Sequence, residues 1–177
     1  MILGLDISTS ITGATILDAS GSMLFNEAWD TRNKKKFETL YDKASLVNQR
    51  LHEVRDTWDI KEVFIEQSLQ SFRSGFSSAR TLSTLSRFNG IVSWLSYDIF
   101  QIEPRLIAAA SARKLAGLSI KRGENAKEKV LQFVLDNVKG FEVQYTKFGN
   151  PSPGVFDRAD SLVVAMAGLE ICKSEKK

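Results

Sequence analysis

The sequence predicts an α/β fold in which helices flank a five-stranded mixed sheet, organised as one domain over residues 1–177. Three apolar runs joined by short turns occupy the first 29 residues. Strands joined so closely run antiparallel, which predicts a three-stranded meander. Two further apolar runs each follow a helical pattern, and strands reached through a crossover helix normally run parallel within the same sheet.

The predicted meander contains a strand that ends near Ile7, a second over Thr12–Leu17 and a third over Met23–Trp29. Turn-forming residues separate them. Asp6 lies inside the first apolar run. An ionised carboxylate is costly to bury alone, and either a basic side chain or a metal ion would offset that cost. The alternative is that Asp6 only caps a turn.

An amphipathic helix of about twenty residues is predicted next, opening at Asn33–Lys36. Apolar residues recur at three- and four-residue steps as far as Trp58. The following apolar run, Val63–Glu66, ends in a carboxylate, as the first strand does. In parallel beside that strand, it would bring Glu66 near Asp6. Repulsion between two such acids favours a shared cation.

A polar segment over residues 67–78 contains aromatic and basic side chains, which suit either a loop folded onto the core or contact with nucleic acid. The helix predicted after it extends to Ile99, and Ile91 and Trp94 widen its apolar face. Either a dimer contact or a thick core would explain that width. Phe100–Pro104 is predicted to be a short strand that the proline ends.

Two shorter helices are predicted next. Leu106–Leu115 is rich in alanine and ends with two basic residues, which suit the negative end of the helix dipole. A basic turn with Lys121, Arg122 and Lys127 opens the second helix. Such a charged run is usually a solvated face. If these residues contacted phosphates instead, they would give salt-sensitive binding that is independent of sequence.

The last part of the chain supplies two more acids. Residues 140–156 have no clear period and predict a loop over the acidic face. Asp157 and Asp160 then lie three residues apart in the first turn of a helix, so they share one face. N-capping would need only one of them. With Asp6 and Glu66 they make four acids without a histidine or cysteine cluster, and oxygen ligands of this kind suit Mg²⁺ or Mn²⁺.

Composition excludes several other kinds of site. His52 is the only histidine and Cys172 the only cysteine, so an internal disulfide and a His- or Cys-rich metal site are both excluded. A net charge of +3 permits a nucleic-acid partner without requiring one. No run reaches the ~18 apolar residues of a membrane span, and the apolar start lacks the basic region of a signal peptide. We therefore expect a cytoplasmic protein.

Four segments follow in order over nearly the whole chain: Gly4–Asp6, Thr12–Gly13, Phe64–Gln67 and Asp157–Leu162. In these segments the chain resembles the RuvC family of Holliday junction resolvases, within the ribonuclease H-like superfamily. The resemblance implies a homodimeric endonuclease that nicks symmetric strands of a four-way DNA junction. It also implies hydrolysis with two Mg²⁺ ions per active site, or Mn²⁺ as a substitute, leaving 5′-phosphate and 3′-hydroxyl ends.

The resemblance assigns roles by position. Asp6, Glu66, Asp157 and Asp160 are the expected metal-binding catalytic acids. Lys127 is the expected basic residue near the scissile phosphate, where it would steady the developing charge.

Further residues are expected to contact DNA. Lys114 matches a second DNA-contacting lysine of the family, and in the loop after Glu66 the base-stacking position is held by Leu69, with Phe72 the nearest aromatic. The full expected DNA-binding set is Lys114, Lys121, Arg122, Lys127, Leu69, Phe72 and Arg73.

Two departures indicate a divergent member, such as one from a phage or another virus. Asp6-Ile7-Ser8 replaces the family's usual Asp-Pro-Gly, and the segment 140–154 is longer than expected of bacterial members. A broader branched-DNA nuclease of the same fold, cutting forks or flaps, and a non-catalytic junction-binding protein therefore stay open. Actin-like ATPases and sugar kinases also begin with a strand, an aspartate and a glycine-containing turn, but they need two such domains and this chain supplies one.

Overall fold

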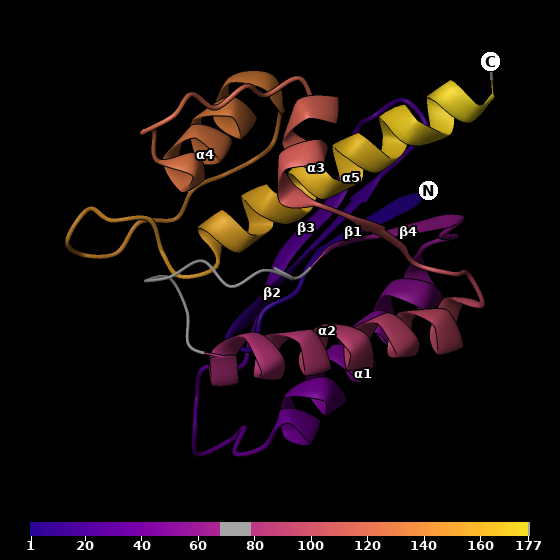
Figure 1. Ribbon diagram of the computed structural model, residues 1–177, viewed down its shortest axis with the longest axis vertical. Helices are drawn as coiled ribbons and strands as arrows, with labels where there is room; N and C mark the ends of the chain where they lie inside the picture. Colours follow the sequence, from indigo (N-terminus) through magenta and orange to yellow (C-terminus); the bar gives the residue numbers. More distant parts are fainter. Residues whose placement is uncertain (68–78, 177) are drawn as a thin grey trace.

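A five-stranded sheet lies between two layers of helices in the computed structural model, which describes residues 1–67 and 79–176 (Figure 1). The strands lie in the order β3-β2-β1-β4-β5. β1, β2 and β3 form the antiparallel meander, whereas β4 runs parallel to both β1 and β5. Their bounds are β1 Ile2–Asp6, β2 Ile11–Leu17, β3 Met23–Asp30, β4 Glu62–Glu66 and β5 Arg105–Ile107. The predicted fold class is confirmed.

The helices divide between the two faces of the sheet (Figure 1). Their bounds are α1 Leu40–Thr57, α2 Ala79–Phe100, α3 Ala109–Leu115, α4 Ala126–Asn137 and α5 Val155–Glu175. α1 and α2 cover one face, and α3, α4 and α5 cover the other. Within the described part of the chain, no helix is both long and apolar enough to cross a membrane.

The central strand β1 is fixed from both sides. Its alternating side chains place Leu3 and Leu5 in the core beneath α1 and α2, and Ile2 in the core beneath α5. Leu3 and Leu5 are fully buried, and burial of such a side chain stabilises the fold by about 1.5–3 kcal/mol. The end of β1, where Asp6 lies, is therefore held in a rigid part of the molecule.

Close contact between α5 and the sheet depends on small residues. A Cβ atom added to Gly4 would lie 2.6 Å from the Ala165 nitrogen and 2.6 Å from the Ser161 oxygen. On the helix side, a Cβ atom at Gly168 would lie 2.4 Å from the ring of Phe64. The backbone of α5 therefore contacts the backbone of β1 at Gly4 and the Phe64 ring of β4 at Gly168, which fixes α5 across these two strands.

The predicted start of the first helix is wrong. α1 begins at Leu40 rather than at Asn33, because Thr39 caps it. The Asp42 N–H donates to the Thr39 hydroxyl at 3.1 Å, and the Thr39 N–H donates to the Asp42 carboxylate at 2.8 Å. This reciprocal capping box satisfies backbone donors that a helix start leaves free. The residues around Lys36 form a turn ahead of it.

The strand predicted over Phe100–Pro104 is also wrong. Phe100 is the last residue of α2, and the chain leaves the helix through Gln101, whose φ of 56° is left-handed. Strand β5 begins at Arg105, directly after the proline, and the helix expected from Leu106 begins at Ala109. The apolar side chains before Pro104 pack against the core without pairing as a strand.

Candidate active site

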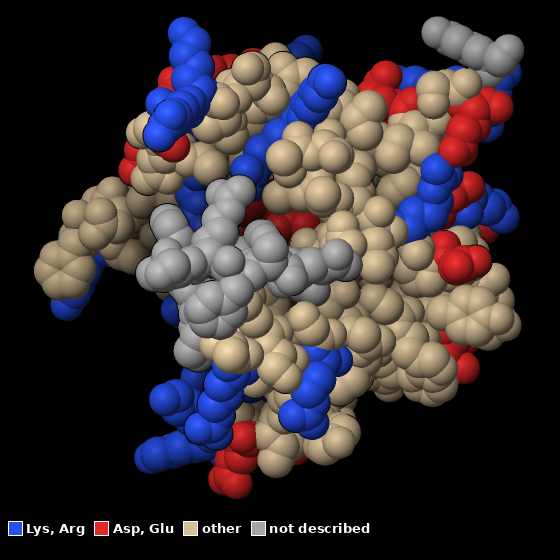
Figure 2. Space-filling model, in the orientation of Figure 1, with Lys and Arg blue, Asp and Glu red and all other residues tan. Residues whose placement is uncertain are grey.

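Four acids lie at one end of the sheet. Asp6 ends β1 and Glu66 ends β4, and the parallel register pairs the residues just before them, Leu5 with Ile65. Asp157 and Asp160 lie in the first turns of α5, which crosses the same strands. Figure 2 shows acidic atoms in the middle of the face that the view of Figure 1 presents, with basic side chains above and below them.

Gly13 allows the start of α5 to come so close. Gly13 is the antiparallel partner of Asp6, and a Cβ atom added to it would lie only 1.9 Å from the carbonyl oxygen of Asp157. Only a residue without a side chain leaves room there. The backbone of Asp157 therefore lies directly against the strand pair that carries Asp6.

A buried polar network fixes the first turns of α5 to the meander. The hydroxyl groups of Thr15 and Ser161 are 2.8 Å apart and fully buried. The Asn26 side-chain amide donates to the Thr15 hydroxyl at 2.7 Å and to the Arg158 carbonyl at 3.0 Å. In return, Arg158 Nε donates to the Asn26 side-chain oxygen at 2.7 Å. Satisfied buried networks of this kind make a position rigid, and Asp157 and Asp160 flank Arg158 in sequence.

The acids share a strongly desolvated environment. Burial, reinforced by the charges of Glu66, Asp160 and Asp157, raises the pKa of Asp6 well above its usual range. Burial, together with the charge of Asp160, raises the pKa of Glu66 to about 7. Burial raises the pKa of Asp160 to about 6, with a contribution from Asp157, and it also raises the pKa of Asp157. Such shifts are typical of sites that need a cation for full ionisation.

Basic side chains of α3 and α4 act on these acids. Lys127, in the first turn of α4, lowers the pKa of all four. Its ammonium group lies 6.0 Å from the ring centre of Phe156, next to Asp157. Arg113 of α3 lowers the pKa of Glu66 and Asp160. The structure thus places Lys127 at the predicted site.

Arg113 and Arg32 are the residues that sequence reasoning missed. Arg113 follows the buried Ala112 on α3 and is half-buried, whereas the expected DNA-contacting Lys114 is exposed and does not act on the pKa of any of the four acids. Arg32 follows β3, and its guanidinium group donates to both carboxylate oxygens of Asp30 at 2.6–3.1 Å. Arg32 also lowers the pKa of Asp157. No local periodicity of the sequence marks either arginine.

The structure describes two of the other expected DNA contacts. Lys121 and Arg122 are exposed on the turn before α4. Leu69, Phe72 and Arg73 lie outside the described residues. The Asn89 side chain of α2 donates to the Glu66 carbonyl at 3.1 Å, which fixes the backbone at the end of β4.

The chemistry of the four acids suits a hard divalent cation. Their side-chain ligand atoms are carboxylate oxygens. Burial raises the pKa of all four, and repulsion from neighbouring acids of the set adds to this at Asp6, Glu66 and Asp160, which a cation would relieve. Over residues 1–67 and 79–176, no three Asp, Glu, His or Cys side chains are already grouped as metal ligands. Ion binding would therefore have to draw the carboxylates together from their present arrangement.

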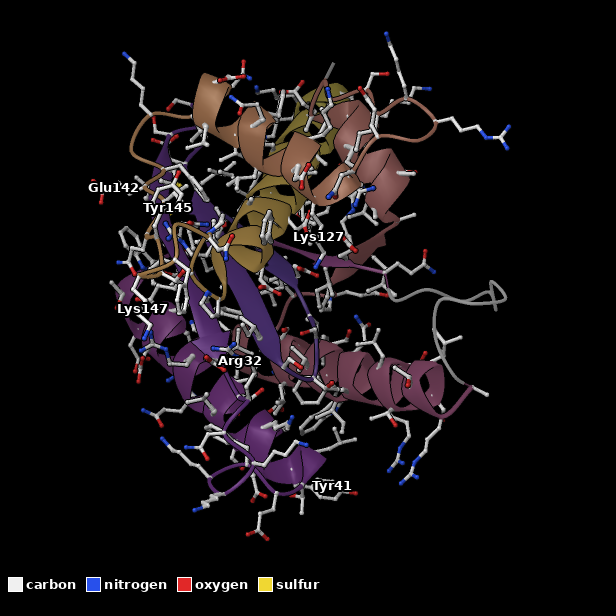
Figure 3. All side chains as sticks on the ribbon, turned by 90° about the vertical axis from the view of Figure 1, so that its left-hand side faces the viewer. Arg32, Tyr41, Lys127, Glu142, Tyr145 and Lys147 are labelled. Carbon is white, nitrogen blue, oxygen red and sulfur yellow. The ribbon has the colours of Figure 1, made fainter. Side chains whose placement is uncertain are left out.

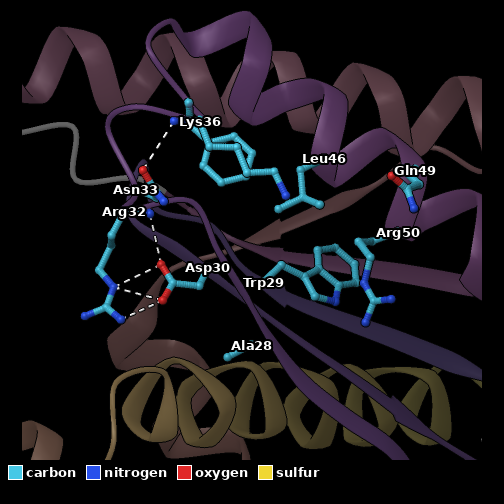
Figure 4. Close-up of a pocket in the computed structure, with 10 residues that line it drawn as sticks. Ala28, Trp29, Asp30, Arg32, Asn33, Lys36, Leu46, Gln49 and Arg50 are labelled. Carbon is cyan, nitrogen blue, oxygen red and sulfur yellow. Dashed lines mark hydrogen bonds and ion pairs between the residues drawn. The ribbon is translucent and has the colours of Figure 1, made fainter.

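A pocket of about 770 Å³ lies between β3 and α1 with the segment that leads into it (Figure 4). It is lined by Ala28, Trp29, Asp30, Arg32, Asn33, Lys36, Phe37, Leu46, Gln49 and Arg50. None of the four acids lines it. Two of its cations are already paired, Arg32 with Asp30 and Arg50 with both Glu27 and Glu53. The pocket is therefore distinct from the acidic site, and Arg32, which lines it, lowers the pKa of Asp157.

Comparison with known proteins identifies the fold. No protein-family model and no curated protein sequence matches the chain. Among solved structures, Thermus thermophilus RuvC in complex with a Holliday junction substrate is similar at a TM-score of 0.69 and 15% identity, over 98% of this chain and 95% of that chain. A second T. thermophilus RuvC structure gives 0.64 and 18%, over 98% and 96%. The yeast mitochondrial Holliday junction resolvase Ydc2 gives 0.63 and 13%, over 99% and 80%.

Identities of 13–18% combined with nearly complete coverage show a shared architecture. The chain therefore has the ribonuclease H-like fold of RuvC.

Proposed function

We propose that this protein is a Holliday junction resolvase, a divalent-metal-dependent endodeoxyribonuclease that nicks symmetric strands of a four-way DNA junction. One observation carries the proposal. Asp6, Glu66, Asp157 and Asp160 come from three elements to one end of the sheet, with Lys127 acting on all of them. The solved structures with the same fold, named above, include a resolvase and a RuvC bound to a Holliday junction.

The four acids would hold two Mg²⁺ ions, or Mn²⁺ in their place. When bound, these ions supply Lewis acidity that activates water and stabilises the leaving oxygen of a phosphodiester. The carboxylates neutralise and orient the ions, and the rigid backbone of β1 and α5 limits how far the ligands move. Hydrolysis in this manner leaves a 5′-phosphate and a 3′-hydroxyl end.

Lys127 would stabilise the negative charge that develops on the scissile phosphate. It is exposed at the start of α4, so a phosphate has access to it, yet it is close enough to the acids to lower the pKa of each. Replacement of Lys127 by alanine should therefore slow cleavage of bound DNA more than it weakens binding.

DNA would extend from this centre over the basic end of α3 and the turn before α4. Lys114, Lys121 and Arg122 are exposed there, and no ion pair engages them within residues 1–67 and 79–176. Such residues would neutralise phosphates and give salt-dependent affinity. In the sequence that follows Glu66, we propose that Leu69, Phe72 and Arg73 contact the DNA near the branch point.

A homodimer would match the two-fold symmetry of a junction and place one active site on each of two strands. Helix α2 is the proposed contact surface. Trp94 is 61% exposed and Tyr97 48% exposed on this helix, and a Cβ atom at Gly90 would meet nothing within 4 Å in the described structure. An apolar face with an open glycine suits close approach by the same helix of a second copy.

The proposal is tested by cleavage of a mobile four-way junction, a fork, a flap and a plain duplex with Mg²⁺, alongside Asp6→Asn. Paired symmetric nicks in the junction, absent with Asp6→Asn, are the expected result. Equal cutting of forks and flaps would indicate a broader branched-DNA nuclease. Tight junction binding without cutting in either Mg²⁺ or Mn²⁺ would indicate a non-catalytic junction-binding protein.

A further inference from the structure

We propose that residues 144–152 form a DNA-contacting hairpin that stacks aromatic side chains on an unstacked base at the branch point. This inference rests on the proposed function, because it takes branched DNA as the partner. It concerns a segment between α4 and α5 to which none of the roles above is assigned. The observations that carry it are the order of the hairpin, its exposed side chains and its attachment to α5.

The hairpin is an ordered structure. Backbone N–H groups of Thr146 and Ser152 donate to the carbonyls of Asn150 and Gln144 at 2.8 and 2.7 Å. At the tip, the Gly149 N–H donates to the Thr146 carbonyl at 3.0 Å, and Gly149 has a φ of 78° that favours glycine. A turn closed by these bonds holds its side chains in a defined direction.

The hairpin exposes two aromatic side chains and a cationic one. Phe148 is 78% exposed and Tyr145 is 62% exposed. The ammonium group of Lys147 lies 5.0 Å from the Phe148 ring centre, and no carboxylate pairs with it within residues 1–67 and 79–176. Leaving large aromatic surface in water gives up the stabilisation that burial would bring, so these residues are better suited to contact a partner.

The chain just before the hairpin is attached to the helix that carries two of the acids. Arg158, between Asp157 and Asp160 in sequence, donates to the Glu142 carbonyl at 3.2 Å and stacks 4.8 Å from the Phe141 ring centre. The hairpin therefore keeps a fixed position relative to those acids. Figure 3 shows Tyr145 and Lys147 on one side of the start of α5, with Lys127 on the other.

The combination of side chains favours nucleic acid as the occupant. Every base offers a flat ring that stacks on an aromatic side chain, and Lys147 beside Phe148 would pair with the adjoining phosphate. In an intact duplex the bases are already stacked on each other. Bases at a branch point are the ones free to stack on a protein ring, so the hairpin would recognise branched DNA over plain duplex.

The test measures binding of the full chain in EDTA, where cleavage does not interfere. The probes are a four-way junction with 2-aminopurine at the branch point and a duplex with the same label. The wild-type protein is compared with Tyr145→Ala/Phe148→Ala and with Tyr41→Ala, which removes an aromatic side chain that is 70% exposed on α1 (Figure 3). Far-ultraviolet circular dichroism confirms that all three are folded.

We expect the double variant to bind the junction about 5- to 150-fold more weakly, the range measured for loss of one base–aromatic stack, and to lose the quenching of 2-aminopurine. Duplex affinity and the Tyr41→Ala variant should stay within twofold of wild type. Lys147→Gln should lower the slope of log affinity against log salt by about one.

Junction affinity and quenching within twofold of wild type in the double variant would overturn the proposal. So would an equal loss with Tyr41→Ala, or a change of oligomeric state without a change in quenching, which would assign the hairpin to a protein contact. If wild-type protein cuts the junction while the double variant binds normally, only the hairpin inference fails. If wild-type protein neither binds nor cuts branched DNA, the proposed function fails with it.

Discussion

Substitution of Gly13 by alanine should move Asp157 on α5 away from Asp6 on β1. The added Cβ atom would lie 1.9 Å from the Asp157 carbonyl oxygen and 2.5 Å from its carbonyl carbon. Real Cβ contacts are essentially never shorter than 3.0 Å, so the first turn of α5 has to retreat by more than 1 Å from β2. Because Gly13 pairs with Asp6, this shift moves Asp157 away from Asp6.

The expected loss has two components. A displacement of about 1 Å in a catalytic arrangement costs roughly 100-fold in rate. Overpacking of a rigid interior costs about 1–3 kcal/mol of folding stability. The shift also strains the Thr15–Ser161 hydrogen bond of 2.8 Å, which fixes the same turn.

The assay is single-turnover cleavage of a four-way junction with protein in excess, combined with urea unfolding. Urea unfolding of the same protein separates a loss of cleavage rate from a loss of folding stability. A Gly13→Ala protein that cuts within threefold of the wild-type rate, at unchanged stability, would refute the account of how α5 is positioned.

Three further predictions concern charge at the site. Metal-free protein should lose folding stability as the pH rises from about 5 to 8. The reason is that Glu66 and Asp160 have pKa values of about 7 and 6 in the folded protein but ionise near pH 4 when unfolded. Urea unfolding at both pH values should show that Glu66→Gln removes up to about 3 kcal/mol of that loss. Mg²⁺ should raise the melting temperature of wild-type protein at pH 8 and much less at pH 5, and Asp6→Asn should weaken that shift. Arg113→Ala should move the acidic limb of the cleavage pH profile to higher pH, because the pKa values of Glu66 and Asp160 rise without its charge, whereas Lys114→Ala should leave the limb in place.

Each of these predictions has a contradicting outcome. A metal-free protein that is equally stable at pH 5 and pH 8 would show that the acids are already compensated. An equal Mg²⁺ effect on wild type and Asp6→Asn would place the bound ion elsewhere. The same pH profile for Arg113→Ala and Lys114→Ala would remove Arg113 from the site.

Much of the fold and part of the site follow from local sequence. Asp6 and Glu66 each end an apolar run, and parallel pairing of the two runs places them together, as the register shows. Asp157 and Asp160 are predictable as one helical face. The role of Lys127 follows from the family resemblance alone and stays a prediction; in the structure Lys127 lowers the pKa of all four acids.

Other features depend on tertiary packing and are not marked by the sequence pattern. Whether Arg113 or Lys114 faces the acids is decided by how the short helix α3 packs against α5. Arg32 lowers the pKa of Asp157 because the segment that follows β3 lies near the start of α5.

The boundary of α1 is a different case. The Thr39–Asp42 capping box was readable in the sequence, but the basic run before it resembles the charged start of a helix. A hydrogen-bonded cap fixes the helix start more strongly than a run of solvated lysines.

The central claim is that Asp6, Glu66, Asp157 and Asp160 act as one metal-holding set in junction cleavage. The most direct test is single-turnover cleavage of a four-way junction in Mg²⁺ by Asp6→Asn, Glu66→Gln, Asp157→Asn and Asp160→Asn. Asp56→Asn, at an exposed acid near the end of α1, is the matched control. The account predicts at least a roughly 100-fold loss for each of the four, as expected when an electrostatic element of a catalytic site is removed, and a wild-type rate for the control. A wild-type rate in any one of the four would contradict it.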